Sequence, residues 1–183
     1  MIHRRLSLFL LLACVLGATA AQQSAAGGDF TLTDHNGEKF RLTDQRGKVI
    51  LLFFGYTSCT EACPVILSRV NSVFKQLGPE REKVLAVFIS VDPQRDTPQV
   101  LREYVKYFSA HTLALTGKKE ELDAVVKQYG AKYEIEKSDS ALGYHVSHTT
   151  DIYLIDQLGA LRARFKHTDR AELMVEGVKR LWR

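Results

Sequence analysis

The 183-residue sequence contains only three cysteines, four prolines and one tryptophan. Three cysteines are too few to build a fold from disulfides, and their odd number leaves one without a partner within the chain. Hydrophobic residues make up 45% of the chain and charged residues 25%, values that exclude collagen-like, low-complexity and disordered classes. The length fits one globular domain with an appendage and excludes a large multidomain enzyme.

The sequence also lacks internal repeats and any basic stripe interleaved with aromatic residues. A nucleic acid is therefore not expected as a partner. The formal net charge is +4, and loss of residues 1–20 with their two arginines lowers it to +2. The basic balance thus belongs partly to the N-terminus, and the remaining charge supports only a weak preference for acidic surfaces. We expect a monomer.

The N-terminus has the layout of a secretory signal. Two arginines precede an apolar run over residues 6–16, and Ala18-Thr19-Ala20 supplies a cleavage pattern of small residues. The run is shorter than the roughly 20 residues of a membrane-spanning helix. An uncleaved anchor and a lipoprotein acylated at Cys14 are the alternatives. Each predicts an exported domain, either periplasmic or tethered to the outer face of the cytoplasmic membrane.

We expect residues 1–20 to be the signal peptide or anchor, 21–28 a flexible tether and 29–183 the folded domain. Residues 29–41 alternate around Asn36-Gly37, which predicts a hairpin. Continuously apolar runs favour buried parallel strands, whereas helical spacing marks the segments between them. The pattern predicts strands over 49–54, 84–90, 146–148, 152–155 and 161–165, and helices over 65–77, from 98, around 122–129 and after a cap at Asp169. This order describes an α/β thioredoxin-like fold, a central mixed sheet flanked by helices with an extra N-terminal β-hairpin.

Two cysteines lie where the first buried strand meets a helix, in the segment GYTSCTEACP. If the helix starts at Thr60, Cys59 and Cys63 face the same side. The helix N-terminus favours their thiolates, which serve both disulfide exchange and soft-metal binding. A structural disulfide over so short a loop would constrain the unfolded chain little. The carboxyl end of a central strand is also where α/β folds build sites.

A metal site needs a third ligand, and His145 and His148 in GYHVSHTT are the candidates. Residues three apart on a strand point to opposite faces, so at most one of them faces the cysteines. From the residues alone, either histidine also fits a purely structural role. We assign Asp92, Asp96 and Asp151 to turns, caps and surface pairing.

The segments FFGYTSCTEACP, FISVDPQRDTP and HVSHTTDIYLID together resemble the Sco (SenC) family of copper-binding proteins, from about Gly28 to the last helix. The resemblance implies that Cys59, Cys63 and His148 bind Cu(I), Cu(II) or both, and that the cysteines form a disulfide when oxidised. His148 is preferred over His145 because it directly precedes Thr149-Thr150 and the apolar strand. Such a donor set suits copper, whereas structural zinc usually has four protein ligands.

What the family resemblance implies about function is copper delivery to the binuclear copper centre of cytochrome c oxidase during assembly. The expected partners are the copper-binding subunit of that oxidase and other copper carriers or thiol reductants. Thr60 and Glu61 stand where the family commonly has Pro and Asp, and Ser147 where it commonly has Asp. These departures leave the three ligands in place, so they bear on affinity, partner choice and redox potential more than on copper binding itself.

The copper carrier that we expect would not be an enzyme. The alternative function is that of a thiol–disulfide oxidoreductase. Cys59 would attack a partner disulfide and Cys63 would resolve the mixed disulfide. Three residues separate the cysteines, instead of the two of thioredoxin-type motifs, and no proline precedes the strand at Ile152. The two functions are compatible, since reducing a partner's cysteines would prepare them for copper. A peroxiredoxin-like peroxidase fits less well because Thr57 is one residue too close to Cys59.

Overall fold

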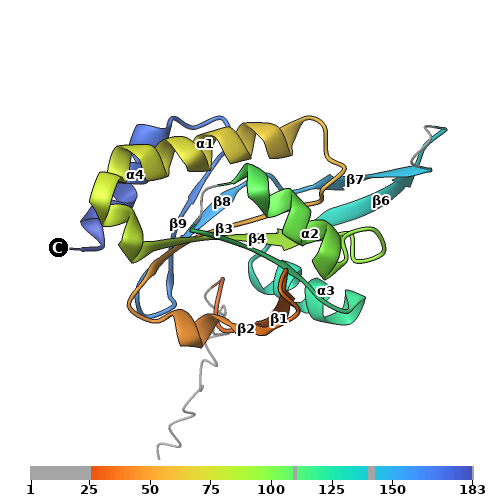
Figure 1. Cartoon of the computed structure of the whole chain (residues 1–183), viewed down its shortest axis with the longest axis horizontal. Helices are drawn as coiled ribbons and strands as arrows, with labels where there is room; N and C mark the ends of the chain where they lie inside the picture. Colours follow the sequence, from red (N-terminus) through yellow and green to blue (C-terminus); the bar gives the residue numbers. More distant parts are fainter. Residues whose placement is uncertain (1–25, 109–110, 140–142, 183) are drawn as a thin grey trace, which may run out of the picture.

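A computed structural model describes residues 26–108, 111–139 and 143–182 (Figure 1). The expected signal segment and Cys14 lie outside this part of the chain. None of the helices within it has both the length and the apolar character needed to cross a membrane. The first hydrogen bonds of the domain come earlier than Asp29. The Gly27 N–H donates to the carbonyl of Gln128, and the Tyr129 hydroxyl donates to the carbonyl of Gly28.

Seven strands form a central mixed sheet in the order β2-β1-β5-β4-β3-β8-β9. The two middle strands, β3 and β4, are parallel and every residue in them is buried. Burial on both faces explains their continuously apolar sequences. The N-terminal hairpin β1–β2 extends one edge beside β5, and β8 and β9 run antiparallel on the other side. The strands are β1 (Thr31–Asp34), β2 (Lys39–Arg41), β3 (Val49–Gly55), β4 (Val84–Ser90), β5 (Thr112–Thr116), β8 (Ile152–Ile155) and β9 (Leu161–Phe165).

Helices cover both faces of this sheet, which confirms the thioredoxin-like class. Figure 1 shows α1 and α4 together on one face and α3 on the other. Alternate residues of the central strands supply the two cores, because successive side chains point to opposite faces. The α-helices are α1 (Ala62–Leu77), α2 (Pro98–Tyr104), α3 (Lys119–Gln128) and α4 (Ala171–Arg180), and 3-10 turns span Leu42–Gln45, Gly78–Lys83 and Val105–Tyr107.

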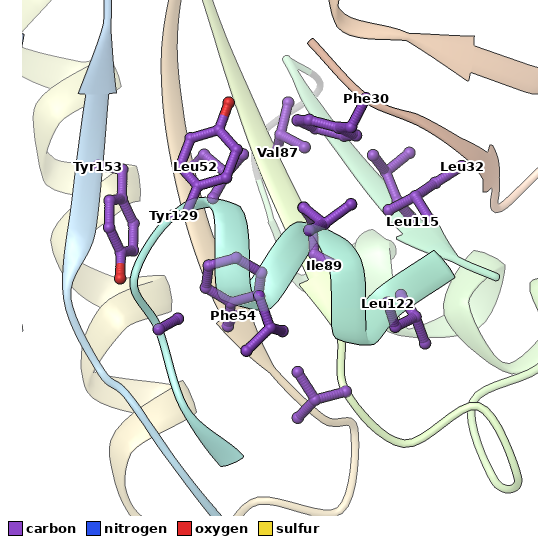
Figure 2. Packing of buried hydrophobic residues seen from close by; sticks show 14 of the residues in the cluster. Phe30, Leu32, Leu52, Phe54, Val87, Ile89, Leu115, Leu122, Tyr129 and Tyr153 are labelled. Carbon is purple, nitrogen blue, oxygen red and sulfur yellow. The ribbon is translucent and has the colours of Figure 1, made fainter. Parts of the chain in front are cut away.

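The core under α3 is rich in aromatic rings (Figure 2). Tyr153 of β8 makes edge-to-face contacts with Phe54 and Tyr129, with both ring centroids 5.7 Å from its own. Tyr153 and Tyr129 are fully buried. This packing fixes β3 against β8, and the loop that follows β3 carries Cys59 and leads to Cys63 at the start of α1.

Two strands stand apart from the central sheet. β6 (Tyr133–Lys137) and β7 (Tyr144–His148) pair only with each other among the described strands, and they form a ribbon that projects beyond the sheet in Figure 1. The sequence predicted the end of β7 but not β6, whose side chains are mostly exposed and show no buried alternation. The ribbon matters because its second strand ends at His148.

The prediction that Asp169 caps the last helix is wrong. The N-cap of α4 is Arg170, and the Asp169 carboxylate accepts the backbone N–H of Lys166 at 2.8 Å. Asp169 therefore closes the turn between β9 and α4. At α2 the cap is Thr97, whose hydroxyl accepts the Val100 N–H at 3.3 Å, with Pro98 as the first helical residue.

Candidate metal centre

The loop between β3 and α1 brings the two cysteine sulfurs together. The helix begins at Ala62, three residues before the predicted span of 65–77 and not at Thr60, so Cys59 lies in the loop and Cys63 in the first helical turn. The Cys59 N–H donates to the Tyr56 carbonyl at 3.1 Å, which tightens the loop. The Cys63 N–H then donates to Cys59 Sγ at 3.5 Å. This backbone turn, rather than helical spacing, sets the separation of the sulfurs.

His148 completes the cluster from the far end of β7. Its Nε2 lies 3.9 Å from Cys63 Sγ, and the ligand atoms of Cys59, Cys63 and His148 all lie within 4.8 Å of one another. Across residues 26–108, 111–139 and 143–182, no other group of three His, Cys, Asp or Glu side chains converges in this way. The fold thus brings together the residues that the sequence selected.

The orientation of the His148 ring suits a ligand. Nδ1 lies 3.0 Å from the carbonyl oxygen of Thr149. A carbonyl can only accept, so Nδ1 carries the proton and Nε2 presents a lone pair towards the cysteines. The Tyr56 ring packs edge-on against the imidazole, with centroids 5.9 Å apart. A histidine held in this way by its second nitrogen is typical of metal ligands.

His145 is directed elsewhere, as the alternation along a strand predicts. Its Nε2 lies 3.1 Å from Glu136 Oε2, directly across the ribbon. His145 and Ser147 are both exposed, whereas Val146 between them is buried. His145 therefore takes no part in the cluster.

The cluster is closed on one side and open on the other. Cys63 is 3% exposed, whereas Cys59 and His148 are half-buried. A cleft of about 490 Å³ lies over them, with Thr60 and Glu61 among its lining residues. A partner can therefore reach Cys59 and His148, while Cys63 is accessible only through the cluster.

The two thiols have opposite acidities. Hydrogen bonds from the Cys63 thiol and from the backbone N–H groups of Cys63 and Glu61 lower the pKa of Cys59, against the opposing effect of burial. The hydrogen bond to Cys59, burial and the negative charge of the Cys59 thiolate raise the pKa of Cys63. The pair therefore holds one thiolate and one thiol that share a proton. A metal ion that binds both sulfurs displaces that proton.

Gly55 at the end of β3 leaves the space that Cys63 occupies. A Cβ at this position would lie 2.7 Å from Cys63 Sγ and 2.7 Å from a ring carbon of Phe88. Any side chain would therefore displace the sulfur or the ring. Gly55 was not among the predicted site residues, although a glycine that ends a strand of large apolar residues signals a close approach.

Asp96 is not a helix cap but binds the cysteine loop through hydrogen bonds from Thr57. It is fully buried, and its carboxylate accepts the Thr57 N–H at 3.0 Å, the Thr57 hydroxyl at 2.6 Å and the Ser90 hydroxyl at 2.5 Å. Burial raises the pKa of Asp96, and the hydrogen bonds from Ser90 and Thr57 oppose that rise. The assignment of Asp96 to a cap or a surface pair is wrong. The carboxylate ties the end of β4 to the loop that carries Cys59.

Asp92 is buried too, with 1% of its surface exposed, so the surface assignment fails here as well. Its backbone carbonyl does accept the Asp96 N–H in a turn, as expected. Its carboxylate accepts the Tyr144 hydroxyl at 2.8 Å and pairs with Arg95. Asp151 lies half-buried between β7 and β8.

The donor set fits a soft metal ion. Two cysteine sulfurs and one imidazole nitrogen converge, and within the described ranges no carboxylate or further histidine joins them. Thiolate and imidazole donors select copper over hard ions such as magnesium or calcium. A structural zinc site would usually hold a fourth protein ligand.

Comparison with known proteins places this site in a family. The SCO1/SenC family model matches residues 18–183. A SCO2-like protein of Rickettsia felis is 36% identical over 140 residues, covering 76% of this chain and 68% of that protein. The structure of Bradyrhizobium japonicum ScoI with copper bound is 36% identical, with a TM-score of 0.78 over 86% of this chain and 99% of that one. Arabidopsis thaliana ScoI with copper bound is 30% identical, with a TM-score of 0.77 over 86% and 98%. With a family match that spans the whole folded domain, this chain belongs to the SCO1/SenC family.

Proposed function

We propose that this protein binds copper through Cys59, Cys63 and His148 and passes it to another protein. The observation that carries the proposal is the convergence of two sulfurs and an Nε2 within 4.8 Å at the floor of an open cleft. The copper-bound structures of two relatives support the choice of metal. Three donors leave coordination positions free, so a recipient's ligands can attack the ion before the first ones leave.

The family resemblance supports a specific role, which is delivery of copper to the binuclear centre of cytochrome c oxidase during assembly. The recipient would be the copper-binding subunit of that oxidase. An exported location follows from the arginines, apolar run and small residues of the N-terminus. Copper would enter and leave the site through the cleft, which the half-buried Cys59 and His148 line.

Copper affinity of four variants tests the proposal. Reduced protein competes with a chromophoric chelator for Cu(I), and Cu(II) binding is followed by its sulfur-to-copper charge-transfer absorption. Cys59→Ser, Cys63→Ser and His148→Ala should each lose at least tenfold in affinity, because each removes a ligand. His145→Ala is the matched control, since it removes a histidine from the same strand that does not reach the cysteines. If His148→Ala binds copper like wild type, the proposed site is wrong.

A thiol–disulfide exchange activity is the second candidate function, and the asymmetry of the cysteines favours it. Cys59 is accessible and ionised, as an attacking thiolate requires, whereas Cys63 is buried and keeps its proton. Cys59 would attack a partner disulfide and release one partner thiolate. Cys63 would then break the mixed disulfide, which leaves a Cys59–Cys63 disulfide and a reduced partner. An external dithiol must return the two electrons. A reductase assay that needs the cysteines but not His148 separates this activity from copper transfer.

A further inference from the structure

The third ligand sits on an element that the central sheet does not hold. β6 and β7 hydrogen bond with each other and with no other described strand. At its base the ribbon is tied to the α3 side, where the Tyr133 hydroxyl donates to Asp123 and Lys132 pairs with Thr149. None of these bonds reaches the cysteine loop. Some other contact must therefore fix His148 relative to Cys59 and Cys63.

Arg95 supplies a contact between the ribbon and the cysteine loop. Its guanidinium carbon lies 3.8 Å from the ring centroid of Tyr144, the first residue of β7, and 5.5 Å from that of Tyr56, which opens the cysteine loop. Its Nη1 donates to the Tyr144 carbonyl at 3.2 Å. One side chain thus touches both elements that carry ligands.

Asp92 holds the guanidinium in this position. Its carboxylate accepts the Arg95 Nε–H on one oxygen and the Tyr144 hydroxyl on the other. Asp92 is almost fully buried, and Arg95 is 20% exposed. A charge-assisted pair this deep is a rigid support rather than a surface ion pair. The arrangement needs a planar cation with several donors, which lysine does not provide.

Tyr56 links this support to the ligand itself. Its ring packs edge-on against His148, with centroids 5.9 Å apart, and also faces the Arg95 guanidinium. A shift of β7 away from Arg95 would therefore change the position of the imidazole. Arg95 and Asp92 belong to the segment FISVDPQRDTP, which contains none of the three proposed copper ligands.

We propose that Arg95 is a positioning residue for the copper site, fastening the β6–β7 ribbon to the cysteine loop so that His148 stays beside Cys63. The effect on copper affinity rests on the proposed copper function, whereas the fastening itself rests only on contacts within the metal-free protein. Removing a residue that orients a metal ligand typically weakens metal binding about 10- to 100-fold. The loss should act entirely through His148.

A double-mutant cycle tests that route. Cu(I) affinities are measured by chelator competition for wild type, Arg95→Gln, His148→Ala and the double variant. We expect Arg95→Gln to weaken binding about 10- to 100-fold, and the double variant to bind no more weakly than His148→Ala. Arg95→Lys should restore little of the affinity. Losses that multiply in the double variant, or an unchanged affinity of Arg95→Gln, would overturn the proposal.

Arg164→Gln is the matched control. Arg164 also packs over a tyrosine, with its guanidinium carbon 5.2 Å from the Tyr153 ring centroid, and donates to the backbone carbonyl of Tyr129 at 2.9 Å. It touches neither β7 nor the cysteine loop. Its replacement should cost stability without changing copper affinity. Tyr144→Phe, which keeps the ring and loses only the bond to Asp92, should show a smaller weakening and serves if Arg95→Gln does not fold.

Amide hydrogen exchange of the metal-free protein gives a second readout that is independent of copper. In Arg95→Gln, exchange over residues 144–148 should accelerate at least tenfold, with α1 and the central strands unchanged. Arg164→Gln should leave the ribbon at the wild-type rate. Unchanged exchange in the ribbon of Arg95→Gln refutes the positioning role, whereas failure of wild type to bind copper refutes only the proposed function.

Discussion

Single side chains other than the three ligands decide the geometry of the centre. Gly55 leaves room for the Cys63 sulfur, and Asp96 anchors Thr57 two residues before Cys59. The Thr149 carbonyl fixes which nitrogen of His148 faces the sulfurs. The site is therefore arranged before a metal arrives, and ligand-preserving substitutions should disturb it.

Gly55→Ala should damage the site while all ligands remain. The added methyl group would press on Cys63 Sγ and on Phe88, each at 2.7 Å. Overpacking of this kind costs about 1–3 kcal/mol in the free energy of unfolding, measured by urea titration. Copper affinity should also fall. Gly177→Ala, which would press on Phe165 at 2.9 Å between α4 and β9, is a control that should lose stability but retain affinity. Equal copper affinity in the two variants would contradict the account.

The acidity of the cysteines predicts a pH profile for alkylation. The pKa of Cys59 is lowered, so its thiolate persists below the pKa of about 8.5 of a free thiol. Iodoacetamide at pH 6 should modify Cys59 nearly as fast as at pH 8 and leave Cys63 unmodified, as peptide mass spectrometry can show. Cys63→Ala removes the hydrogen bond that lowers the pKa most, so the midpoint should move upward. If the pH midpoint of Cys59 alkylation in the wild type lies near 8.5, the thiolate of Cys59 is not stabilised and this prediction is wrong.

Three segments build the site: the end of β3 with the loop after it, the start of α1, and the β6–β7 ribbon. The sequence predicted the first two better than the third. The buried strand before Cys59 and the helix that contains Cys63 follow from hydrophobic runs and helical spacing. The β6–β7 ribbon follows only in part: the end of β7 was predicted over 146–148, but β6 was not, because its mostly exposed side chains carry no periodic signal. Asp92 and Asp96 resembled turn and cap residues, since burial of a carboxylate is set by elements far along the chain.

Asp96 joins β4 to the cysteine loop, and Asp96→Asn should loosen that connection. The amide replaces an acceptor oxygen with a donor that faces the donors of Thr57 and Ser90. The unmatched bond costs about 1–3 kcal/mol in the free energy of unfolding. The pH profile of Cys59 alkylation should shift as well, because the loop moves.

The control for that substitution is Asp156→Asn. Asp156 accepts the Leu158 and Ala160 N–H groups and the Arg162 side chain in the β8–β9 turn, away from the cysteines. It should lower stability without altering Cys59. A normal alkylation profile in Asp96→Asn would argue against a role in the site.

The whole domain consists of a central sheet covered by helices and a β6–β7 ribbon that projects from it. The central strands and the helices on both faces fix Cys59 and Cys63, whereas His148 comes from the ribbon outside the sheet. Two ligands are thus held by the core and the third by side-chain contacts. Such a division suits a carrier, because the ion can leave when one ligand moves and the core stays intact.

Oxidation of the protein should switch copper binding off. The two sulfurs lie within 4.8 Å, so a Cys59–Cys63 disulfide can form with little rearrangement and would remove both thiolate ligands. After treatment with a mild oxidant, copper retained through desalting should fall to background, and a dithiol should restore it. The short loop means a modest gain in stability, about 2 kcal/mol. Retention of a full equivalent of copper by the oxidised protein would contradict this expectation.

The coordination of bound copper tests the central claim most directly. X-ray absorption at the copper edge of the loaded, reduced protein should show two sulfur scatterers and one nitrogen scatterer with the pattern of an imidazole. In His148→Ala the imidazole pattern should disappear while both sulfurs remain, and in His145→Ala the wild-type spectrum should persist. An imidazole signal that survives in His148→Ala, or a wild-type spectrum with fewer than two sulfurs, would contradict a copper site built from Cys59, Cys63 and His148.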